Sequence, residues 1–260
     1  MRIGWLADPG SAIIGGGELS AAHLAAHAPG WAKIVACPAG RVADCDAYVV
    51  QNCRGYTMAD STHLEGRPFV LCVRDYWEHS PGPFRAWALA RARVVVFDSE
   101  PHRAAFPYAG YRASELCPPP VELELFRAAA KASTHRAGTL WLGQMQPHKG
   151  LDAAVAWARQ HGPVDFYGAG PSSPAPEPMV RLCGQVEHER VPETMARYER
   201  FLFLPGWVEP YGKTVIEAWA AGCRLEVHGE IGALWWLEHS PQSIYRATER
   251  FWRLMEAHLG

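Results

Sequence analysis

Two glutamates, Glu209 and Glu217, bracket a turn that leads into a helix. Pro210, Gly212 and Thr214 lie between them, and residues of these types open helices and leave the first backbone N–H groups without partners. A helix N-terminus of this kind attracts anions, phosphate above all. We therefore interpret the segment as an anion-binding turn flanked by two carboxylates.

A cation from an earlier loop can serve the same site. Lys149 follows an apolar run at 139–143 and precedes a helix predicted over residues 151–161. A lysine that joins an acid pair and an anion-binding turn suits a nucleotide diphosphate, whose negative charge it neutralises. The competing interpretation is that both glutamates merely favour the positive end of the helix dipole.

Glycines 15–17 join a strand predicted at residues 2–7 to a helix predicted at 18–27. A glycine loop between a strand and a helix N-terminus can cradle a phosphate, or it can be a flexible connection. The sequence has no G-x-G-x-x-G here, so a dinucleotide-binding fold is not supported.

Two pairs of potential metal ligands are interpreted as solvated surface. Asp44 and Asp46 form a D-x-D ahead of a predicted strand, but two carboxylates alone do not enclose a metal ion. His23 and His27 have a spacing that can bind zinc, yet no carboxylate motif accompanies them. We expect no metal site.

Polar and aromatic residues end a continuous apolar strand predicted at 69–73. Ligands of open parallel sheets bind beyond the carboxyl ends of the strands, so these residues are candidates for contact with a substrate. They are Arg74, Asp75, Tyr76 and Trp77.

Composition bounds the classes of function. The 260 residues are 48% apolar and carry a net charge of −2, which suits one or two packed domains and argues against strongly electrostatic nucleic-acid binding. Segment 84–93 mixes arginine with aromatics, and we interpret it as an amphipathic helix rather than a nucleic-acid contact. The seven cysteines include no C-x-x-C, and we find neither a secretory leader nor a transmembrane-length apolar run. A reduced, cytoplasmic protein is expected.

Strands and helices alternate along both halves of the chain. Continuous apolar strands are typical of parallel sheets that are covered on both faces, so the sequence predicts an α/β protein with two layered domains. A proline run at 118–120 and an Ala/Lys/Ser-rich stretch separate them. The predicted boundaries are a first domain at 1–127, a linker at 128–138, a second domain at 139–241 and a C-terminal helix at 242–260 that packs on the first domain.

These residues together resemble retaining GT-B glycosyltransferases of glycosyltransferase family 4. The resemblance rests on the E-x7-E block from Glu209 to Glu217, continued by Ala-x-Ala-x-Gly222. Supporting segments run along most of the chain: Gly16-Gly17-Glu18-Leu19, Pro118–Phe126, Gly143, Lys149-Gly150-Leu151-Asp152 and Gly168-Ala-Gly170-Pro171. The resemblance implies two Rossmann-like parallel-sheet domains facing across a cleft, with the C-terminal helix crossing back to the first.

The resemblance also implies residue roles. Lys149 would neutralise the donor's diphosphate, Glu209 would hold hydroxyls of the transferred sugar, and Glu217 would bind the ribose hydroxyls. The implied donor-binding set is Gly17, Gly143, Gln144, Lys149, Gly168, Glu209, Tyr211, Gly212, Lys213, Thr214 and Glu217. Glu209, Lys149 and Asp75 would be the catalytic residues, and no cofactor would be required.

The chain departs from the family pattern in two places. Gln144 stands where the family usually has an arginine, and Arg136, His148 or Lys213 would have to replace that cation. The family often has a histidine at the end of the strand that here finishes in Arg74 and Asp75. The segment Arg74–Trp77 would then contact the acceptor, and Asp75 would orient or deprotonate its hydroxyl or would form a salt bridge with Arg74. The chain is also short for this fold, which suggests a reduced acceptor domain.

The predicted function is a metal-independent, retaining hexosyltransferase that uses a UDP- or GDP-sugar. A saccharide or a small hydroxylated metabolite is the expected acceptor, and a hydroxymethylated base in DNA is the alternative. A lipid acceptor would require a basic amphipathic face that the sequence does not show. A nucleotide-sugar epimerase and a non-catalytic nucleotide-sugar-binding module stay open as other classes.

Overall fold

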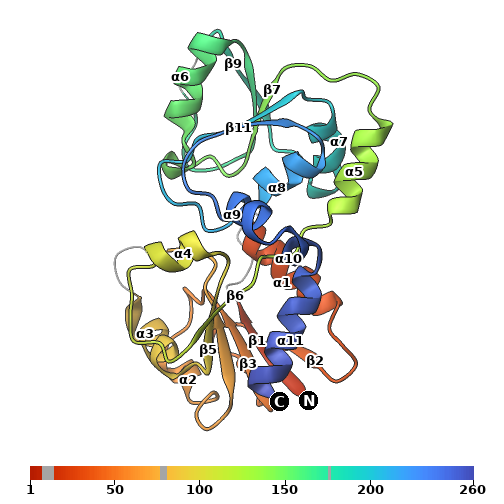
Figure 1. Ribbon diagram of the computed structural model, residues 1–260. Helices are drawn as coiled ribbons and strands as arrows, with labels where there is room; N and C mark the ends of the chain where they lie inside the picture. Colours follow the sequence, from red (N-terminus) through yellow and green to blue (C-terminus); the bar gives the residue numbers. More distant parts are fainter. Residues whose placement is uncertain (8–14, 77–80, 175–176) are drawn as a thin grey trace. The chain divides into compact units, whose positions relative to one another are not determined.

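A computed structural model describes residues 1–7, 15–76, 81–174 and 177–260 (Figure 1). The chain divides into two compact units. The first unit comprises Met1–Pro120 together with His239–Gly260, and the second unit comprises Val121–Glu238. Each unit is built around its own parallel sheet, so the predicted two-domain α/β organisation is confirmed.

The first unit contains a six-stranded sheet in the order β2-β1-β3-β4-β5-β6, with every neighbouring pair parallel. Its strands are β1 (Arg2–Ala7), β2 (Lys33–Ala36), β3 (Ala47–Gln51), β4 (Phe69–Cys72), β5 (Val94–Phe97) and β6 (Ser114–Leu116). The direction of winding reverses between β1 and β3. In sheets of this kind ligands bind at the carboxyl ends of the strands that flank such a reversal.

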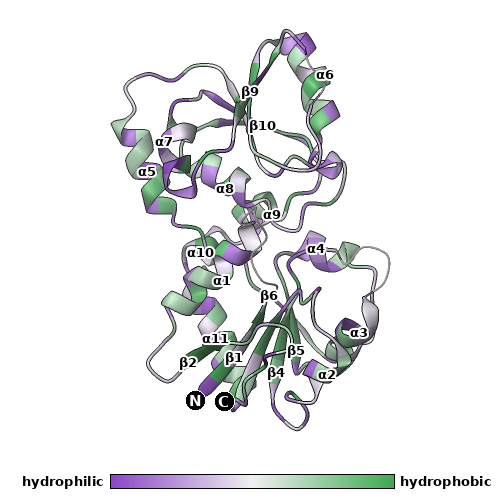
Figure 2. Cartoon of the chain, turned by 180° about the vertical axis from the view of Figure 1, so that it is seen from behind, coloured by the Kyte–Doolittle hydropathy of each residue, from purple (hydrophilic) through white to green (hydrophobic). Residues whose placement is uncertain are grey.

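Apolar side chains alternate between the two faces of this sheet, because successive residues of a strand point in opposite directions. On β1, Ile3 and Trp5 belong to one buried cluster and Leu6 to the other. The covering helices are α1 (Gly16–Ala26), α2 (Met58–Ser61), α3 (Gly82–Arg91), α4 (Glu100–Ala105), α10 (Pro241–Tyr245) and α11 (Ala247–Leu259). Figure 2 shows the hydrophobic strands between them.

The C-terminal segment returns to the first unit. Phe251, Trp252 and Met255 of α11 lie in the same buried cluster as Ile3 and Trp5. The single C-terminal helix predicted over 242–260 is interrupted, since α10 and α11 are separate helices divided at Arg246.

The second unit contains a five-stranded parallel sheet in the order β11-β10-β7-β8-β9. Its strands are β7 (Thr139–Leu142), β8 (Val164–Tyr167), β9 (Val180–Gly184), β10 (Arg200–Phe203) and β11 (Arg224–Val227). Its helices are α5 (Leu123–Ala132), α6 (Leu151–His161), α7 (Val191–Ala196), α8 (Lys213–Ala220) and α9 (Gly232–His239), with short 3-10 turns η1 (Pro147–Lys149) and η2 (His188–Arg190). Winding reverses between β7 and β10.

The structure differs from the expected linker. Residues 128–132 lie in α5, and the division between the units falls at Pro120. Leu123 and Phe126 of this helix are buried, which explains why the segment is ordered against the second unit despite its polar, alanine-rich composition.

Candidate functional site

Lys149 and Glu209 form an ion pair at the winding reversal of the second unit. Lys149 ends η1, which follows β7, and Glu209 lies in the loop that follows β10. The Lys149 ammonium (Nζ) lies 2.8 Å from both Oε1 and Oε2 of Glu209. The two side chains are 20% and 8% exposed. The predicted cation and the first predicted acid therefore meet where parallel sheets bind ligands.

Aromatic rings surround this pair. The Trp207 indole N–H donates to Glu209 Oε2 at 2.8 Å. Lys149 Nζ lies 5.3 Å from the ring centre of Trp207 and 5.9 Å from that of Phe203, within the range of cation–π attraction. The His148 ring lies 4.2 Å from the Trp207 ring, centre to centre. The ammonium is thus held by one carboxylate and two aromatic rings.

Glycine is required where the two loops cross. Gly150 has φ +76°, and a Cβ at this position would lie 1.8 Å from the carbonyl oxygen of Leu204. Beside it, the Gly206 N–H donates to the His148 carbonyl at 2.9 Å. No larger residue fits at Gly150 without moving the backbone, so the Lys149 loop is fixed against the loop that carries Glu209.

The backbone of Glu209 is pinned from its other side. Its N–H donates to the Glu230 carbonyl at 2.8 Å, and its carbonyl accepts from the Gly232 N–H at 3.0 Å. Gly212, with φ +78°, then turns the chain into α8, and a Cβ there would approach Ile231 Cγ2 to 2.8 Å. Glu209 is therefore set at a fixed position just ahead of a helix N-terminus.

Lys213 and Thr214 are the first two residues of α8, where backbone N–H groups have no partner within the helix. The charge of Lys213 affects the pKa values of two neighbouring side chains. Burial and Lys213 together lower the pKa of His188. Burial raises the pKa of Glu217 to about 7, while the charge of Lys213 acts in the opposite direction. The predicted anion-binding turn thus has a lysine, Lys213, at the first position of the helix that it begins.

Glu217 lies in the second turn of α8 and is 4% exposed. Tyr211, which precedes the helix, is 3% exposed, and its carbonyl accepts from the Ala233 N–H at 2.7 Å. Both predicted donor-binding residues are therefore buried beside the turn rather than spread over its surface.

The remaining donor-side glycines pack the loops after β7 and β8 together. At Gly168 a Cβ would lie 1.9 Å from the Gly143 carbonyl oxygen. The Gly143 N–H donates to the Tyr167 carbonyl at 3.1 Å. Gln144 accepts a hydrogen bond from the side chain of Gln146 at 3.2 Å.

Three cations were considered as replacements for the arginine that the family has at the position of Gln144. One of them, Arg136, binds the end of a helix instead. Its guanidinium donates to the carbonyls of Ala221 and Gly222 at 2.5 and 3.1 Å, at the C-terminal end of α8. His148, by contrast, adjoins Lys149, and Lys213 begins α8. The latter two stay candidates.

In the first unit Gly17 lies at the winding reversal of that sheet. Its carbonyl accepts from the Gln51 side chain at 3.0 Å, and a Cβ on it would lie 3.6 Å from Gln51 Nε2 and 4.0 Å from Arg74 Cβ. Glu18 accepts from the Gly15 N–H at 3.0 Å, which fixes the start of α1. The glycine segment and Arg74 thus share one edge of the sheet.

The predicted acceptor residues have different environments. Arg74 forms an ion pair with Asp98 in which both side chains are nearly inaccessible, at 3% and 4% exposed. Asp75 pairs with Arg54 at 2.7 Å and is 25% exposed. The salt bridge considered between Asp75 and Arg74 is therefore replaced by two separate pairs.

Two predicted acceptor residues remain, Tyr76 and Trp77. The Tyr76 ring meets the His102 ring edge-on, 5.1 Å between centres. Burial, followed by the nearby charge of Arg74, lowers the pKa of His102 to about 3, so this imidazole is neutral at pH 7. Trp77 lies outside the described residues.

The D-x-D pair lies just ahead of β3, at the edge of the sheet opposite the strand carboxyl ends. Asp46 accepts from the Arg2 backbone N–H at 2.7 Å, and Asp44 pairs with Arg67 at 3.5 Å. His23 bonds to Thr248 at 3.1 Å. Within the described ranges, no three His, Cys, Asp or Glu side chains gather as metal ligands.

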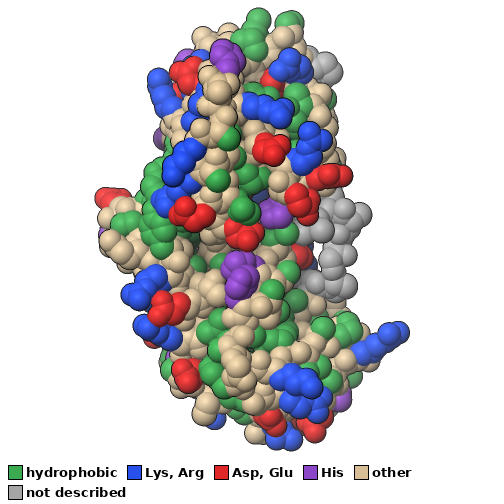
Figure 3. Space-filling view, turned by 90° about the vertical axis from the view of Figure 1, so that its right-hand side faces the viewer, with side chains coloured by type: hydrophobic (Ala, Val, Ile, Leu, Met, Phe, Trp, Pro, Cys, Tyr) green, Lys and Arg blue, Asp and Glu red, His purple; other side chains and the backbone are tan. Residues whose placement is uncertain are grey.

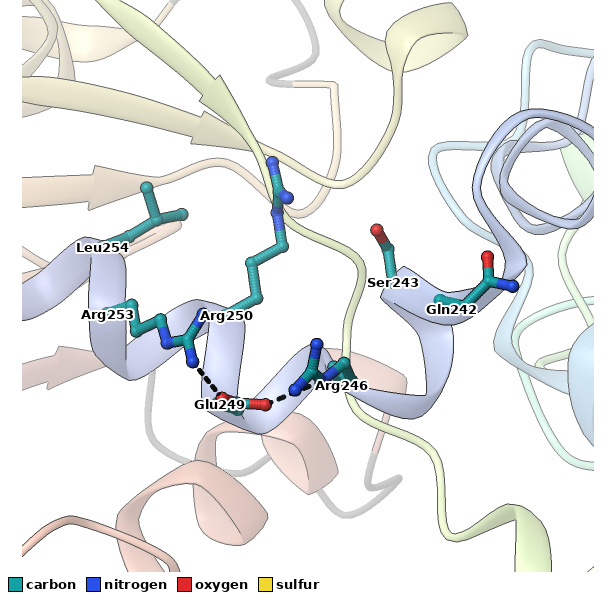
Figure 4. A pocket seen from close by; sticks show the side chains of 7 residues that line it. All are labelled: Gln242, Ser243, Arg246, Glu249, Arg250, Arg253 and Leu254. Carbon is teal, nitrogen blue, oxygen red and sulfur yellow. Dashed lines mark hydrogen bonds and ion pairs between the residues drawn. The ribbon is translucent and has the colours of Figure 1, made fainter.

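A surface hollow of the first unit lies along α10 and α11 (Figure 4). Glu249 pairs there with Arg246 at 3.0 Å and also with Arg253, so the charges of this hollow are partly compensated. The predicted site residues lie on other elements.

Four neighbours of the site residues were not predicted from the sequence: Trp207, Gln51, Arg54 and Asp98. Only Trp207 carried a local signal, since it stands two residues before Glu209 and residues so spaced share one side of an extended segment. The others meet the site through tertiary packing alone.

Among helices in the described part of the chain, none has the length and apolarity to span a bilayer. No protein-family model matches the chain, and no curated protein matches it by sequence.

Solved structures do match it. Anabaena HepE in complex with UDP aligns with a TM-score of 0.66 and 16% identity over 100% of this chain and 96% of that one. Sucrose-phosphate synthase from Thermosynechococcus elongatus aligns with 0.64 and 13%, covering 100% and 95%. AviGT4, a glycosyltransferase involved in avilamycin A biosynthesis, aligns with 0.63 and 16%, covering 100% and 93%. With its two parallel sheets, the chain has the GT-B architecture that the sequence predicted.

Proposed function

We propose that this protein is a retaining, metal-independent glycosyltransferase that moves a sugar from a nucleotide diphosphate to an acceptor hydroxyl. The observation that carries the proposal is the Lys149–Glu209 pair beside the N-terminus of α8, at the winding reversal of the second unit. The fold likeness to HepE, which has been solved with UDP and with UDP-glucose, supports a UDP-sugar as the donor, and a GDP-sugar is the alternative.

Charge complementarity supports this assignment. A diphosphate placed at Gly212–Thr214 meets the N-terminus of α8, Lys213 and, across the loop, Lys149. As the bond between the anomeric carbon and the diphosphate breaks, the negative charge that develops on the leaving oxygen is stabilised by these groups. Two lysines and the helix N-terminus supply positive charge directly from the chain, which is the basis for proposing that no metal is needed.

Two carboxylates then have separate tasks. Glu209 accepts hydrogen bonds from hydroxyls of the transferred sugar, and Glu217, held beside the turn, accepts them from the ribose. The acceptor hydroxyl attacks from the face that the diphosphate leaves, so the anomeric configuration is retained. Asp75, which keeps 25% of its side chain exposed, orients that hydroxyl and accepts the proton that it loses.

A saccharide or a small hydroxylated metabolite is the proposed acceptor. Basic and acidic side chains are interspersed on the face shown in Figure 3, a distribution that favours a small neutral acceptor over a DNA backbone. The free cysteines, six of them buried, support a reducing, cytoplasmic location.

The test is a panel of UDP-, GDP-, ADP- and dTDP-sugars, incubated with the protein and a set of simple saccharides. Release of the nucleoside diphosphate with a product of retained anomeric configuration, read by NMR, is expected, and K149A and E209A should abolish it. E177A is the matched control, because Glu177 is an ion-paired glutamate of the same unit that contacts Arg159 instead. An isomerised donor would indicate an epimerase, and binding without turnover a non-catalytic module.

A further inference from the structure

Trp207 touches both members of the Lys149–Glu209 pair. Its indole N–H donates to Glu209 Oε2 at 2.8 Å, and its ring lies 5.3 Å from Lys149 Nζ. Lys149 itself reaches both carboxylate oxygens. Glu209 Oε2 therefore has two donors from protein side chains, whereas Oε1 has Lys149.

We propose that Trp207 is a positioning residue that holds Glu209 by Oε2 and leaves Oε1 for a hydroxyl of the donor sugar. This inference rests on the proposed function, because it assigns the sugar hydroxyl to one oxygen of the same carboxylate. It adds a residue, Trp207, that acts through Glu209 and not on the substrate.

The need for such a residue follows from the two partners of Lys149. A diphosphate draws the Lys149 ammonium toward its own oxygens and so removes a cation from Glu209. A carboxylate that is 8% exposed and has lost its cation would turn toward solvent unless another donor retained it. The indole N–H stays in place as that donor, and a hydrogen bond to a charged acceptor is among the stronger ones in proteins.

The indole can fill this role because its own position is fixed. The His148 ring lies 4.2 Å from it, centre to centre, and the neighbouring Gly206 N–H donates to the His148 carbonyl. The loop of Lys149 and the loop of Glu209 are thus joined through backbone and ring contacts that do not involve the ammonium. Movement of Lys149 toward a phosphate leaves this contact intact.

A spectroscopic test needs no ligand. The Trp207 indole N–H resonance is identified in a 1H–15N spectrum by its loss in W207F. In E209Q this resonance should move upfield by more than any other indole signal, because its acceptor has lost its charge. The matched control is the Trp157 indole resonance, which is identified by its loss in W157F and should not move in E209Q. Trp157 belongs to the same unit but stacks on His161, with 4.5 Å between ring centres. A Trp207 resonance that E209Q leaves unmoved would overturn the inference.

A binding test then separates sugar from phosphate. Calorimetry with UDP and with UDP-glucose should show W207F binding UDP as the wild type does and UDP-glucose about 10- to 100-fold more weakly. W157F should match the wild type for both ligands. In the E209Q background, adding W207F should cause no further loss, because residues that act through one another are not additive.

The outcomes distinguish the two proposals. Wild-type protein that binds none of the sugar nucleotides would overturn the proposed function, while the spectrum would still decide whether Trp207 holds Glu209. Wild-type binding of UDP-glucose together with an unaltered W207F would overturn the positioning role and leave the glycosyltransferase proposal standing. Equal, additive losses in both backgrounds would indicate a merely structural tryptophan.

Discussion

The ammonium of Lys149 lies 2.8 Å from each carboxylate oxygen of Glu209. One residue is the proposed partner of the donor's diphosphate and the other of its sugar. In this ion pair the two side chains neutralise each other, and a diphosphate would have to compete with Glu209 for Lys149. This competition makes the two residues distinguishable by experiment.

E209Q should bind UDP more tightly than the wild type while losing transfer. The amide keeps a similar shape but no longer competes for Lys149 as an anion, so UDP affinity should rise by about three- to tenfold. K149M should lower the affinity for UDP and for UDP-glucose alike. Calorimetry on the two variants measures both effects, and unchanged or weaker UDP binding by E209Q would contradict a competition between Glu209 and the diphosphate for Lys149.

The meeting of Lys149 and Glu209 was predictable from the sequence because general rules act on both loops. Buried parallel strands are recognisable in a sequence as apolar runs, and ligands bind at the carboxyl ends of such strands. Gly150 and Gly212 both have positive φ, so each glycine in the sequence did mark a turn of the backbone. These features depend on residues close in sequence.

Other elements were missed for identifiable reasons. The edge strand β11 alternates Arg224 and Glu226, which pair at 2.8 Å, and so lacks the apolar run of a buried strand. The Asp98 partner of Arg74 stands 24 residues away, and no spacing rule links the two. Pairings created by tertiary packing leave no periodic trace.

Stability should fall with rising pH because of Glu217. Burial raises the pKa of Glu217 from 4.5 to about 7, so between these values the folded protein holds a proton that the unfolded chain releases. The contribution is fully present below pH 4.5 and is lost as the pH rises through 7, and its upper bound is about 3 kcal/mol.

Urea denaturation at about pH 5.5 and about pH 8 tests this dependence. E217Q, which cannot ionise, should gain stability relative to the wild type at the higher pH and much less at the lower. A difference between the two proteins that is the same at both pH values would contradict the assignment of this effect to Glu217.

G150A should unfold the second unit far more readily than G184A. The two glycines have nearly the same positive φ, +76° and +78°, so both alanines incur the left-handed backbone penalty of about 1 to 2 kcal/mol. A Cβ added at Gly184 would have no atom within 4 Å among the described residues, whereas at Gly150 the Cβ would lie 1.8 Å from the Leu204 carbonyl oxygen. Chemical denaturation should show an additional loss of about 2 kcal/mol or more for G150A.

Variants of the buried ion pair between Arg74 and Asp98 test whether the end of β4 has a structural role or a catalytic one. R74M or D98N leaves one buried charge without its partner, and the free energy of unfolding should fall by about 3 to 5 kcal/mol. R54M should cost less than about 1 kcal/mol, because the Arg54 side chain that pairs with Asp75 is 64% exposed.

D75N supplies the complementary result. It should keep wild-type stability and UDP affinity while transfer to a saccharide slows by about 100-fold or more, because an amide cannot take up the proton of the attacking hydroxyl. Initial rates of transfer measured beside donor hydrolysis isolate the acceptor step. If D75N transferred normally while R74M stayed folded and failed to transfer, the acceptor contact would belong to Arg74, and the buried guanidinium would have to exchange Asp98 for substrate during turnover.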